Sequence, residues 1–374
     1  MCSFMSAQEG IYFRNCTWNE AVELAKSENK PIFIDFYTQW CGPCYNMAKN
    51  IFVLHSVGSF YNDKFICLKM DAENGEGIGL AKKYGVRSYP TYLFVDPKDQ
   101  SEIHRSSGRQ DAGTFIFTGK SALVPSLCSR YLEEEYTRGN RNAEFLLDYA
   151  MYKGSIYDKK AVDAVCNILL ETNDCQLDDK HCLLENEKIW NLFVKYINGL
   201  DTPFFKMMVS NKIILEQLYG KDAVAAKFYG ETQYSKDKGA VIALPEFEGK
   251  DVVLMYMDYD RAILDKDYRT AAVAADKLMA YQGPLYEEVC KYLYYIGRSN
   301  LYGEFPDVWH NKCLEICRYV AYNHPNRNDA SIHQLYALQL EMWAKRIGKE
   351  FPSLQFGAKE YSMRPKDLKV KPKK

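Results

Sequence analysis

The chain has 374 residues, of which 47% are hydrophobic, so it is long enough to form two or three globular domains. Its net charge of −1 at pH 7 gives no support for binding to nucleic acid, and no stretch is apolar and long enough to predict a membrane span. The 12 cysteines are about 3% of the chain, far below the share found in disulfide scaffolds.

The first nine residues allow two interpretations. Ser6 and Ala7 are small residues of the kind that end a signal peptide, whereas the segment has no basic n-region and is too short to be a complete one. The alternative is a disordered terminus. The sequence therefore leaves export, for example to a periplasm, and a cytoplasmic location open, with export favoured.

The first elements predicted along the chain are a short strand at residues 11–13, a helix and a long apolar strand. Thr17 and Glu20 have the spacing of a capping box, which predicts that a helix begins there. Residues 32–37 are almost all apolar or aromatic, as expected for a strand buried on both faces. Asp35 interrupts this run, and a buried carboxylate must be neutralised or paired.

The motif Trp40-Cys41-Gly42-Pro43-Cys44 follows this strand directly. Apolar residues at helical spacing within 47–52 predict a helix after it, and Pro43 suits the first turn of that helix. Cys41 is therefore expected at a helix N-terminus, where unpaired backbone N–H groups and the helix dipole favour a thiolate. A thiolate is the nucleophile of disulfide exchange.

A pair of cysteines at this spacing can also belong to a zinc site. Such a site needs four ligands, but no second pair follows, the six histidines are scattered, and His181 and Cys182 near Cys175 lack a fourth candidate ligand. Redox chemistry is therefore favoured, and no metal site is predicted. Cys313 and Cys317 lie on an apolar helical stripe and are predicted to be core residues.

The elements that follow complete a mixed α/β pattern. Strands are predicted at residues 65–70 and 91–95, with a second hairpin arm at 101–105. A short helix is predicted around residues 78–84, and another begins near Asp111. The order of these elements predicts a mixed sheet with helices on both faces.

Residues 10–120, about the first third of the chain, resemble a thioredoxin-fold domain. The resemblance implies a thiol–disulfide oxidoreductase in which Cys41 attacks a disulfide of a protein substrate and Cys44 resolves the mixed disulfide. We expect Cys41 to be exposed at the strand–helix junction and Cys44, one turn into the helix, to be more buried. The matching features are Asp35 six residues before Cys41, WCGPC at 40–44, Asp71 at a strand end, Tyr89-Pro90-Thr91, and Gly108 after the last hairpin.

The same resemblance implies roles for residues around the cysteines. Asp35 accepts or relays the proton of Cys44, and Pro90 is a cis proline that faces the active-site disulfide. Tyr89, Pro90 and Thr91 form the groove for an extended substrate segment. Tyr89 is larger than the residue that usually precedes this proline.

The motif also indicates a direction of reaction. Gly42 and Pro43 set and stiffen the turn, and a Gly-Pro pair between the cysteines resembles reducing members, so disulfide reduction is favoured. Trp40 covers the active-site surface, with packing in the core as its alternative. Tyr45 stands where thioredoxins usually carry a basic residue, and Cys67 where many have a buried lysine. These departures argue against a general housekeeping thioredoxin.

Beyond the thioredoxin-like part the pattern becomes helical. Residues 121–363 are predicted to form an all-helical domain of helical hairpins with a break at 231–250, and residues 364–374 a basic tail. One helix is predicted from Ala122 to Arg138, with a kink near Pro125. The architecture resembles a tetratricopeptide-type array, and an irregular helical domain is the alternative.

The sequence therefore predicts a disulfide reductase fused to a helical region that recruits or orients a protein partner. The reaction needs protein substrates with disulfides and an unidentified reductant, but no cofactor beyond the redox-active Cys41–Cys44 pair. The alternative is a helical protein–protein interaction scaffold whose thioredoxin domain is a docking or redox-sensing module. That alternative follows from the extent of the helical region, which is about two thirds of the chain.

Overall fold

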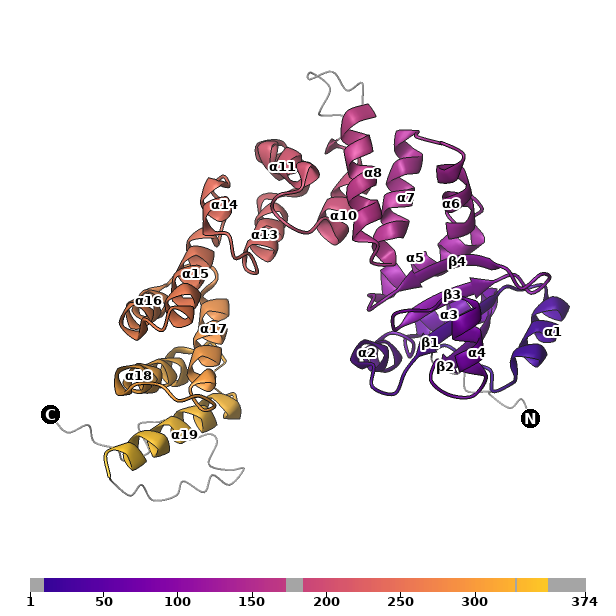
Figure 1. Cartoon of the computed structure of the whole chain (residues 1–374). Helices are drawn as coiled ribbons and strands as arrows, with labels where there is room; N and C mark the ends of the chain where they lie inside the picture. Colours follow the sequence, from indigo (N-terminus) through magenta and orange to yellow (C-terminus); the bar gives the residue numbers. More distant parts are fainter. Residues whose placement is uncertain (1–9, 173–183, 327, 349–374) are drawn as a thin grey trace, which may run out of the picture. The chain divides into compact units, whose positions relative to one another are not determined.

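The computed structural model of the chain describes residues 10–172, 184–326 and 328–348 (Figure 1). The chain divides into two compact units, Met1–Met208 and Val209–Lys374, each of which is described by itself. The predictions for residues 1–9, for Cys175 with His181 and Cys182, and for the basic tail lie outside the described residues. Among the described residues, no helix is long and apolar enough to cross a membrane.

The first unit is built on four strands: β1 (Ile32–Tyr37), β2 (Ile66–Asp71), β3 (Thr91–Val95) and β4 (Glu102–Ser107). They form one mixed sheet in the order β2-β1-β3-β4. β1 pairs in parallel with β2 and antiparallel with β3, and β3 pairs antiparallel with β4. β1 is therefore an inner strand, and its first five residues are buried, as the apolar run predicted.

Helices cover both faces of this sheet, which confirms the predicted mixed α/β fold. Each face has its own apolar core. Ile34 of β1 packs in the core of the first face, which contains residues of two helices, and Phe33 packs in the core of the second face, which contains residues of three. Asp35 points to the same face as Phe33, because alternate residues of a strand share a face. The first face carries α1 (Trp18–Glu28), which begins with the predicted capping box, and α4 (Glu76–Lys83); the second carries α2 (Gly42–Asn50), α3 (His55–Lys64) and α5 (Ala112–Leu123).

The predicted strand at residues 11–13 is wrong. Ile11 N donates to Phe52 O at 2.7 Å, and Arg14 N donates to Cys67 O at 2.8 Å. Phe52 lies in the turn between α2 and α3 and Cys67 lies in β2, so the segment joins no continuous ladder. The apolar side chain of Ile11 is buried all the same, in the core that contains Phe33.

The helices that follow the sheet are part of the same unit. Figure 1 shows α6, α7 and α8 beyond β4. Hydrogen bonds from Ser129 and Arg130 join α6 to that strand. Ser129 N donates to His104 Nδ1 at 3.1 Å, and Arg130 Nε donates to Glu102 O at 2.8 Å. The domain boundary predicted between residues 120 and 121 falls inside α5. The helix after it, α6, still packs on β4. These helices are α6 (Ser129–Thr137), α7 (Ala143–Ser155), α8 (Lys159–Thr172) and α10 (Glu187–Tyr196), and the unit ends within α11 (Pro203–Ser210).

The single helix predicted from Ala122 to Arg138 is also wrong. α5 ends at Leu123, and α6 begins only at Ser129. Val124 is extended, with φ −101° and ψ 112°. A residue before proline avoids helical backbone angles, and Pro125 has no N–H to donate to a helical hydrogen bond. The helix therefore ends here instead of bending.

The second unit is made of helices, and those from α15 to α19 contribute to one apolar core. The predicted apolar stripe with Cys313 and Cys317 lies on α18, and Leu293 of α17 and Trp309 and Cys313 of α18 are among the buried residues. Residues 231–250 were predicted to lack a helix, but they contain α14, capped by the side chain of Asp237. The tetratricopeptide-type array stays a prediction. The helices are α12 (Lys212–Tyr219), α13 (Lys221–Thr232), α14 (Lys238–Ala243), α15 (Lys250–Leu264), α16 (Tyr268–Ala280), α17 (Tyr286–Ser299), α18 (Asp307–Asn323) and α19 (Ala330–Arg346).

The packing of α7 against α10 can be tested with two helical glycines. A β-carbon on Gly154 of α7 would lie 2.3 Å from Tyr196 Cγ, whereas one on Gly79 of α4 would meet no atom within 4 Å. We expect Gly154→Ala to lower the free energy of unfolding by about 1–3 kcal/mol through overpacking. Gly79→Ala should raise it by about 0.4–1 kcal/mol. Denaturant unfolding measures both, and equal stability of the two variants would contradict the α7–α10 contact.

Candidate active site

Cys41 and Cys44 are joined by a disulfide bond at the start of α2. β1 ends at Tyr37, and the short turn after it brings Cys41 to the N-cap of the helix. There the Cys41 sulfur accepts a hydrogen bond from Cys44 N at 3.1 Å. Gly42 and Pro43 between them are exposed, so the backbone on the outer side of the disulfide is open to an approaching substrate.

The two cysteines do not differ in burial. Each is 5% exposed, so the expectation that Cys41 is the more accessible of the pair is wrong for this oxidised form. The disulfide holds the two sulfurs together, and the surroundings that cover one therefore cover the other. What distinguishes Cys41 is its N-cap position, where a backbone N–H points at its sulfur.

Trp40 lies on the surface, which rules out its packing in the core. Its side chain is 70% exposed, and Nε1 donates to both carboxylate oxygens of Glu73, at 3.1 and 3.0 Å. The ring meets that of Tyr89 edge to face, with 6.0 Å between centroids. Trp40 thus joins the cysteine motif to the loop that precedes β3. Sequence reasoning missed Glu73, since nothing in the motif indicates this partner.

The Tyr89–Pro90 peptide bond is cis. Pro90 is buried, and its carbonyl oxygen accepts a hydrogen bond from Gly108 N at 2.9 Å. Thr91 is 3% exposed, and its Oγ1 donates to Ser88 O at 2.7 Å. The loop is therefore held from two sides, by its own backbone and by the end of β4.

Asp35 is buried in the middle of β1, opposite Lys69 of β2 and Tyr92 of β3. Its Oδ1 has no hydrogen-bond partner among the described residues. Burial raises the pKa of Asp35 from 3.8 to about 7, and the charge of Lys69 opposes part of that rise. A carboxyl with a pKa close to 7 can both accept and release a proton at neutral pH.

The residues near Asp35 explain one departure from the thioredoxin pattern. Cys67 pairs with Phe33, two positions before the Asp35 pair, and burial raises its pKa to about 12. The cation beside Asp35 is instead Lys69, which is exposed and lies over the ring of Tyr37 at 4.6 Å. Sequence reasoning missed Lys69, because only the register of the parallel pair places it opposite Asp35.

The other described cysteines form no disulfide. Cys313 and Cys317 are buried in α18, which confirms their predicted place in the core, and burial raises the pKa of Cys317 to about 12. Cys16 is the free cysteine that is partly exposed among those described. Within the described ranges, no three His, Cys, Asp or Glu side chains gather as a metal site.

Comparisons with known proteins match the N-terminal part of the chain. A family model described as thioredoxin-like matches residues 13–97. A thioredoxin-like protein of Synechocystis is 34% identical over 94 residues, which are 25% of this chain and 83% of that protein. Chloroplastic thioredoxin Y of Oryza sativa is 33% identical over 107 residues, or 29% of this chain and 60% of that protein.

Among solved structures, a candidate disulphide-isomerase from Bacteroides thetaiotaomicron is 40% identical. The match covers 31% of this chain and 94% of that one, with a TM-score of 0.29. Each of these matches covers less than a third of the chain. The similarity therefore concerns the thioredoxin-like part and not the helical region that follows it. Through residues 13–97, which contain the Cys41–Cys44 disulfide, the chain belongs to the thioredoxin-like family.

Proposed function

We propose that the chain is a thiol–disulfide oxidoreductase that reduces disulfides in protein substrates. The observation that carries this proposal is the Cys41–Cys44 disulfide at the start of α2, with the Cys44 N–H directed at the Cys41 sulfur. The same N–H and the helix dipole would stabilise a Cys41 thiolate once the pair is reduced. The Gly-Pro pair between the cysteines supports the reducing direction, and the reaction uses no cofactor beyond the two thiols.

The proposed reaction consists of two exchanges. The Cys41 thiolate attacks one sulfur of a substrate disulfide, forms a mixed disulfide and releases the other substrate sulfur as a thiolate. The Cys44 thiolate then attacks the Cys41 sulfur, which forms the intramolecular disulfide and releases the second substrate thiolate. The substrate gains two electrons and two protons, and an external dithiol reductant returns Cys41 and Cys44 to thiols.

Asp35 is proposed as the base that accepts the proton of Cys44 before the second exchange. Support comes from its position on the α2 face of the sheet, its burial and its raised pKa. Tyr89, Pro90 and Thr91 are proposed to bind an extended substrate segment through backbone pairing. The exposed ring of Trp40 lies at one side of that groove.

The roles of the two cysteines can be separated by substitution. Cys41→Ser should lower the rate of insulin disulfide reduction by at least about 1,000-fold, because the nucleophile is lost. Cys44→Ser should accumulate mixed disulfides that a non-reducing gel detects, since the resolving thiol is lost. Cys16→Ser, at a partly exposed cysteine outside the site, is the matched control and should keep the wild-type rate. Equal rates for wild type and Cys41→Ser would refute the proposal.

The proton transfer assigned to Asp35 can be tested through its pH dependence. In wild type, the rate at which Cys44 releases the mixed disulfide should rise with pH through about 7, where Asp35 loses its proton. Asp35→Asn should lower that rate about 10- to 100-fold and remove the inflection. Stopped-flow measurements from pH 5.5 to 8.5 follow this step. An unchanged inflection in the variant would assign it to another group.

The raised pKa of Asp35 also makes a stability prediction. The native pKa of about 7 lies above the ordinary value of 3.8, so between these pH values the unfolded chain binds fewer protons than the native one. The free energy of unfolding should therefore fall as pH rises through this window, by at most about 4 kcal/mol. Thermal unfolding of Asp35→Asn should lack this fall. A stability difference between the two proteins that is independent of pH would contradict a buried, protonated Asp35.

A scaffold is the second candidate function, because the helices of the second unit lie outside the matched residues 13–97. The Cys44→Ser variant discriminates between the two candidates. Mixed disulfides with many client proteins favour the oxidoreductase. A single stoichiometric partner that still binds when Cys41 is also replaced favours the scaffold, whose partner would be bound through the helical region.

A further inference from the structure

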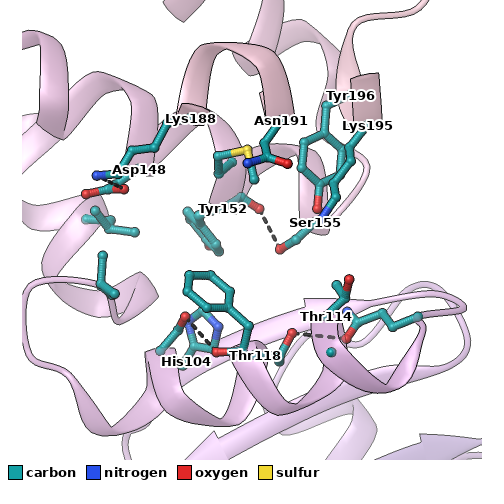
Figure 2. Close-up of a pocket in the computed structure, with 17 residues that line it drawn as sticks. His104, Thr114, Thr118, Asp148, Tyr152, Ser155, Lys188, Asn191, Lys195 and Tyr196 are labelled. Carbon is teal, nitrogen blue, oxygen red and sulfur yellow. Dashed lines mark hydrogen bonds and ion pairs between the residues drawn. The ribbon is translucent and has the colours of Figure 1, made fainter. Parts of the chain in front are cut away.

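Two adjoining cavities form a cleft between the sheet end of the first unit and the helices that follow it; we call it the α5–α10 cleft. The outer cavity, of 520 Å³, is lined by Ser107 at the end of β4, by Arg109 after it and by Tyr157 between α7 and α8. The inner cavity, of 360 Å³, lies between α5 and α10, as Figure 2 shows for Thr118 and Asn191. Both cavities are lined by Gln110, Thr114, Ser155, Lys195 and Tyr196, so they form one continuous space.

The outer end of the α5–α10 cleft adjoins the proposed substrate groove. Gly108 lies between Ser107 and Arg109, and its N–H donates to Pro90 O at 2.9 Å. Tyr157 lies directly over Gly108, since a β-carbon there would be 1.7 Å from Tyr157 Oη. A substrate segment that leaves the cis-proline loop beside Gly108 would therefore pass Tyr157. This tyrosine belongs to the helical region and is 66% exposed.

The outer cavity carries an excess of positive charge. Its lining includes the cations Arg109, Lys159 and Lys195 and one carboxylate, Asp111, which caps α5 by accepting from Thr114 N. Arg109 and Lys195 are exposed, and neither has an ion-pair partner within 4 Å among the described residues. Exposed cations at one end of a groove favour an anionic partner and raise its rate of association.

The inner cavity is lined by apolar side chains together with polar ones. Phe117 of α5 and Met151 of α7 are among its apolar residues, and Phe117 is 55% exposed. Of its charged residues, Lys188 is paired with Asp148 at 2.8 Å. His104, which also lines this cavity, is neutral, because burial lowers its pKa to about 3. Its Nδ1 accepts from Ser129 N, which leaves the proton on Nε2 as a donor. Such a site suits an apolar side chain beside a backbone carbonyl.

We propose that the α5–α10 cleft binds the segment of the protein substrate next to its disulfide and selects segments that carry acidic residues followed by a bulky apolar one. This inference rests on the proposed function. The acidic residues meet Arg109 and Lys195, and the apolar side chain enters the cavity of Figure 2. The helical region thereby becomes part of substrate recognition, and Tyr157 is a specificity-determining residue beside the groove.

The test uses two synthetic peptides that share one intramolecular disulfide loop. One peptide has Glu-Glu-Glu-Leu on both sides of the loop, and the other has Lys-Lys-Lys-Leu. The full chain is reduced with dithiothreitol, freed of it and mixed with each peptide, and the second-order rate constant of peptide reduction is measured. We expect the acidic peptide to react about 10-fold faster at low ionic strength and the ratio to fall towards 1 in about 0.5 M salt.

Two charge-reversal variants locate the source of the preference. Arg109→Glu/Lys195→Glu should bring the ratio to 1 or reverse it, because two of the three exposed cations that line the outer cavity are replaced by carboxylates and only Lys159 remains. Lys160→Glu/Lys206→Glu makes the same change of net charge at exposed residues of the first unit that do not line the cleft, and should keep the ratio. The comparison separates local recognition from the effect of overall charge.

The outcomes also separate this inference from the function on which it rests. Reduction of neither peptide would refute the oxidoreductase itself. Reduction of both at equal rates, or a preference that survives Arg109→Glu/Lys195→Glu, would overturn the assignment of the cleft and leave the oxidoreductase standing. An equal loss of preference in the Lys160→Glu/Lys206→Glu control would also overturn it, because overall charge would then explain the selectivity.

Discussion

The burial of β1 between β2 and β3 is the constraint on which the first unit depends. A strand paired on both sides and covered on both faces excludes water, so the one carboxyl within it, Asp35, has its pKa raised to about 7. The same strand ends shortly before the cysteine motif and so sets where α2 begins. One set of strand pairings therefore positions both the titrating carboxyl and the disulfide.

A series of contacts extends from this disulfide to the helical region. Trp40 contacts Tyr89, the carbonyl of Pro90 is bonded to Gly108, and Tyr157 lies over Gly108. α6 is bonded to the outer strand β4 through Ser129 N and Arg130 Nε, which holds this helix against the sheet. The helices that follow the thioredoxin-like residues 13–97 therefore pack against the sheet and continue the first unit beyond them.

Local signals in the sequence predicted local structure well. The Thr17–Glu20 capping box begins α1, because both of its hydrogen bonds lie within four residues. Residues 11–13 have a strand-like composition, but a strand needs a partner ladder, and their neighbours supply only isolated acceptors. Pro125 was recognised as a disturbance, yet whether it bends or ends a helix depends on what the flanking turns pack against.

The sequence by itself determined a set of local patterns: a CGPC pair after an apolar strand, a carboxyl within that strand and a Tyr89-Pro90-Thr91 segment. Together these patterns resemble the thioredoxin fold, and the resemblance implies that the proline faces the cysteines. Only the tertiary structure decided that Lys69 is the cation beside Asp35, that the two cysteines are equally buried, and that Tyr157 lies over Gly108. The position of Lys69 depends on strand register and that of Tyr157 on helix packing, both between residues far apart in the chain, which no local pattern encodes.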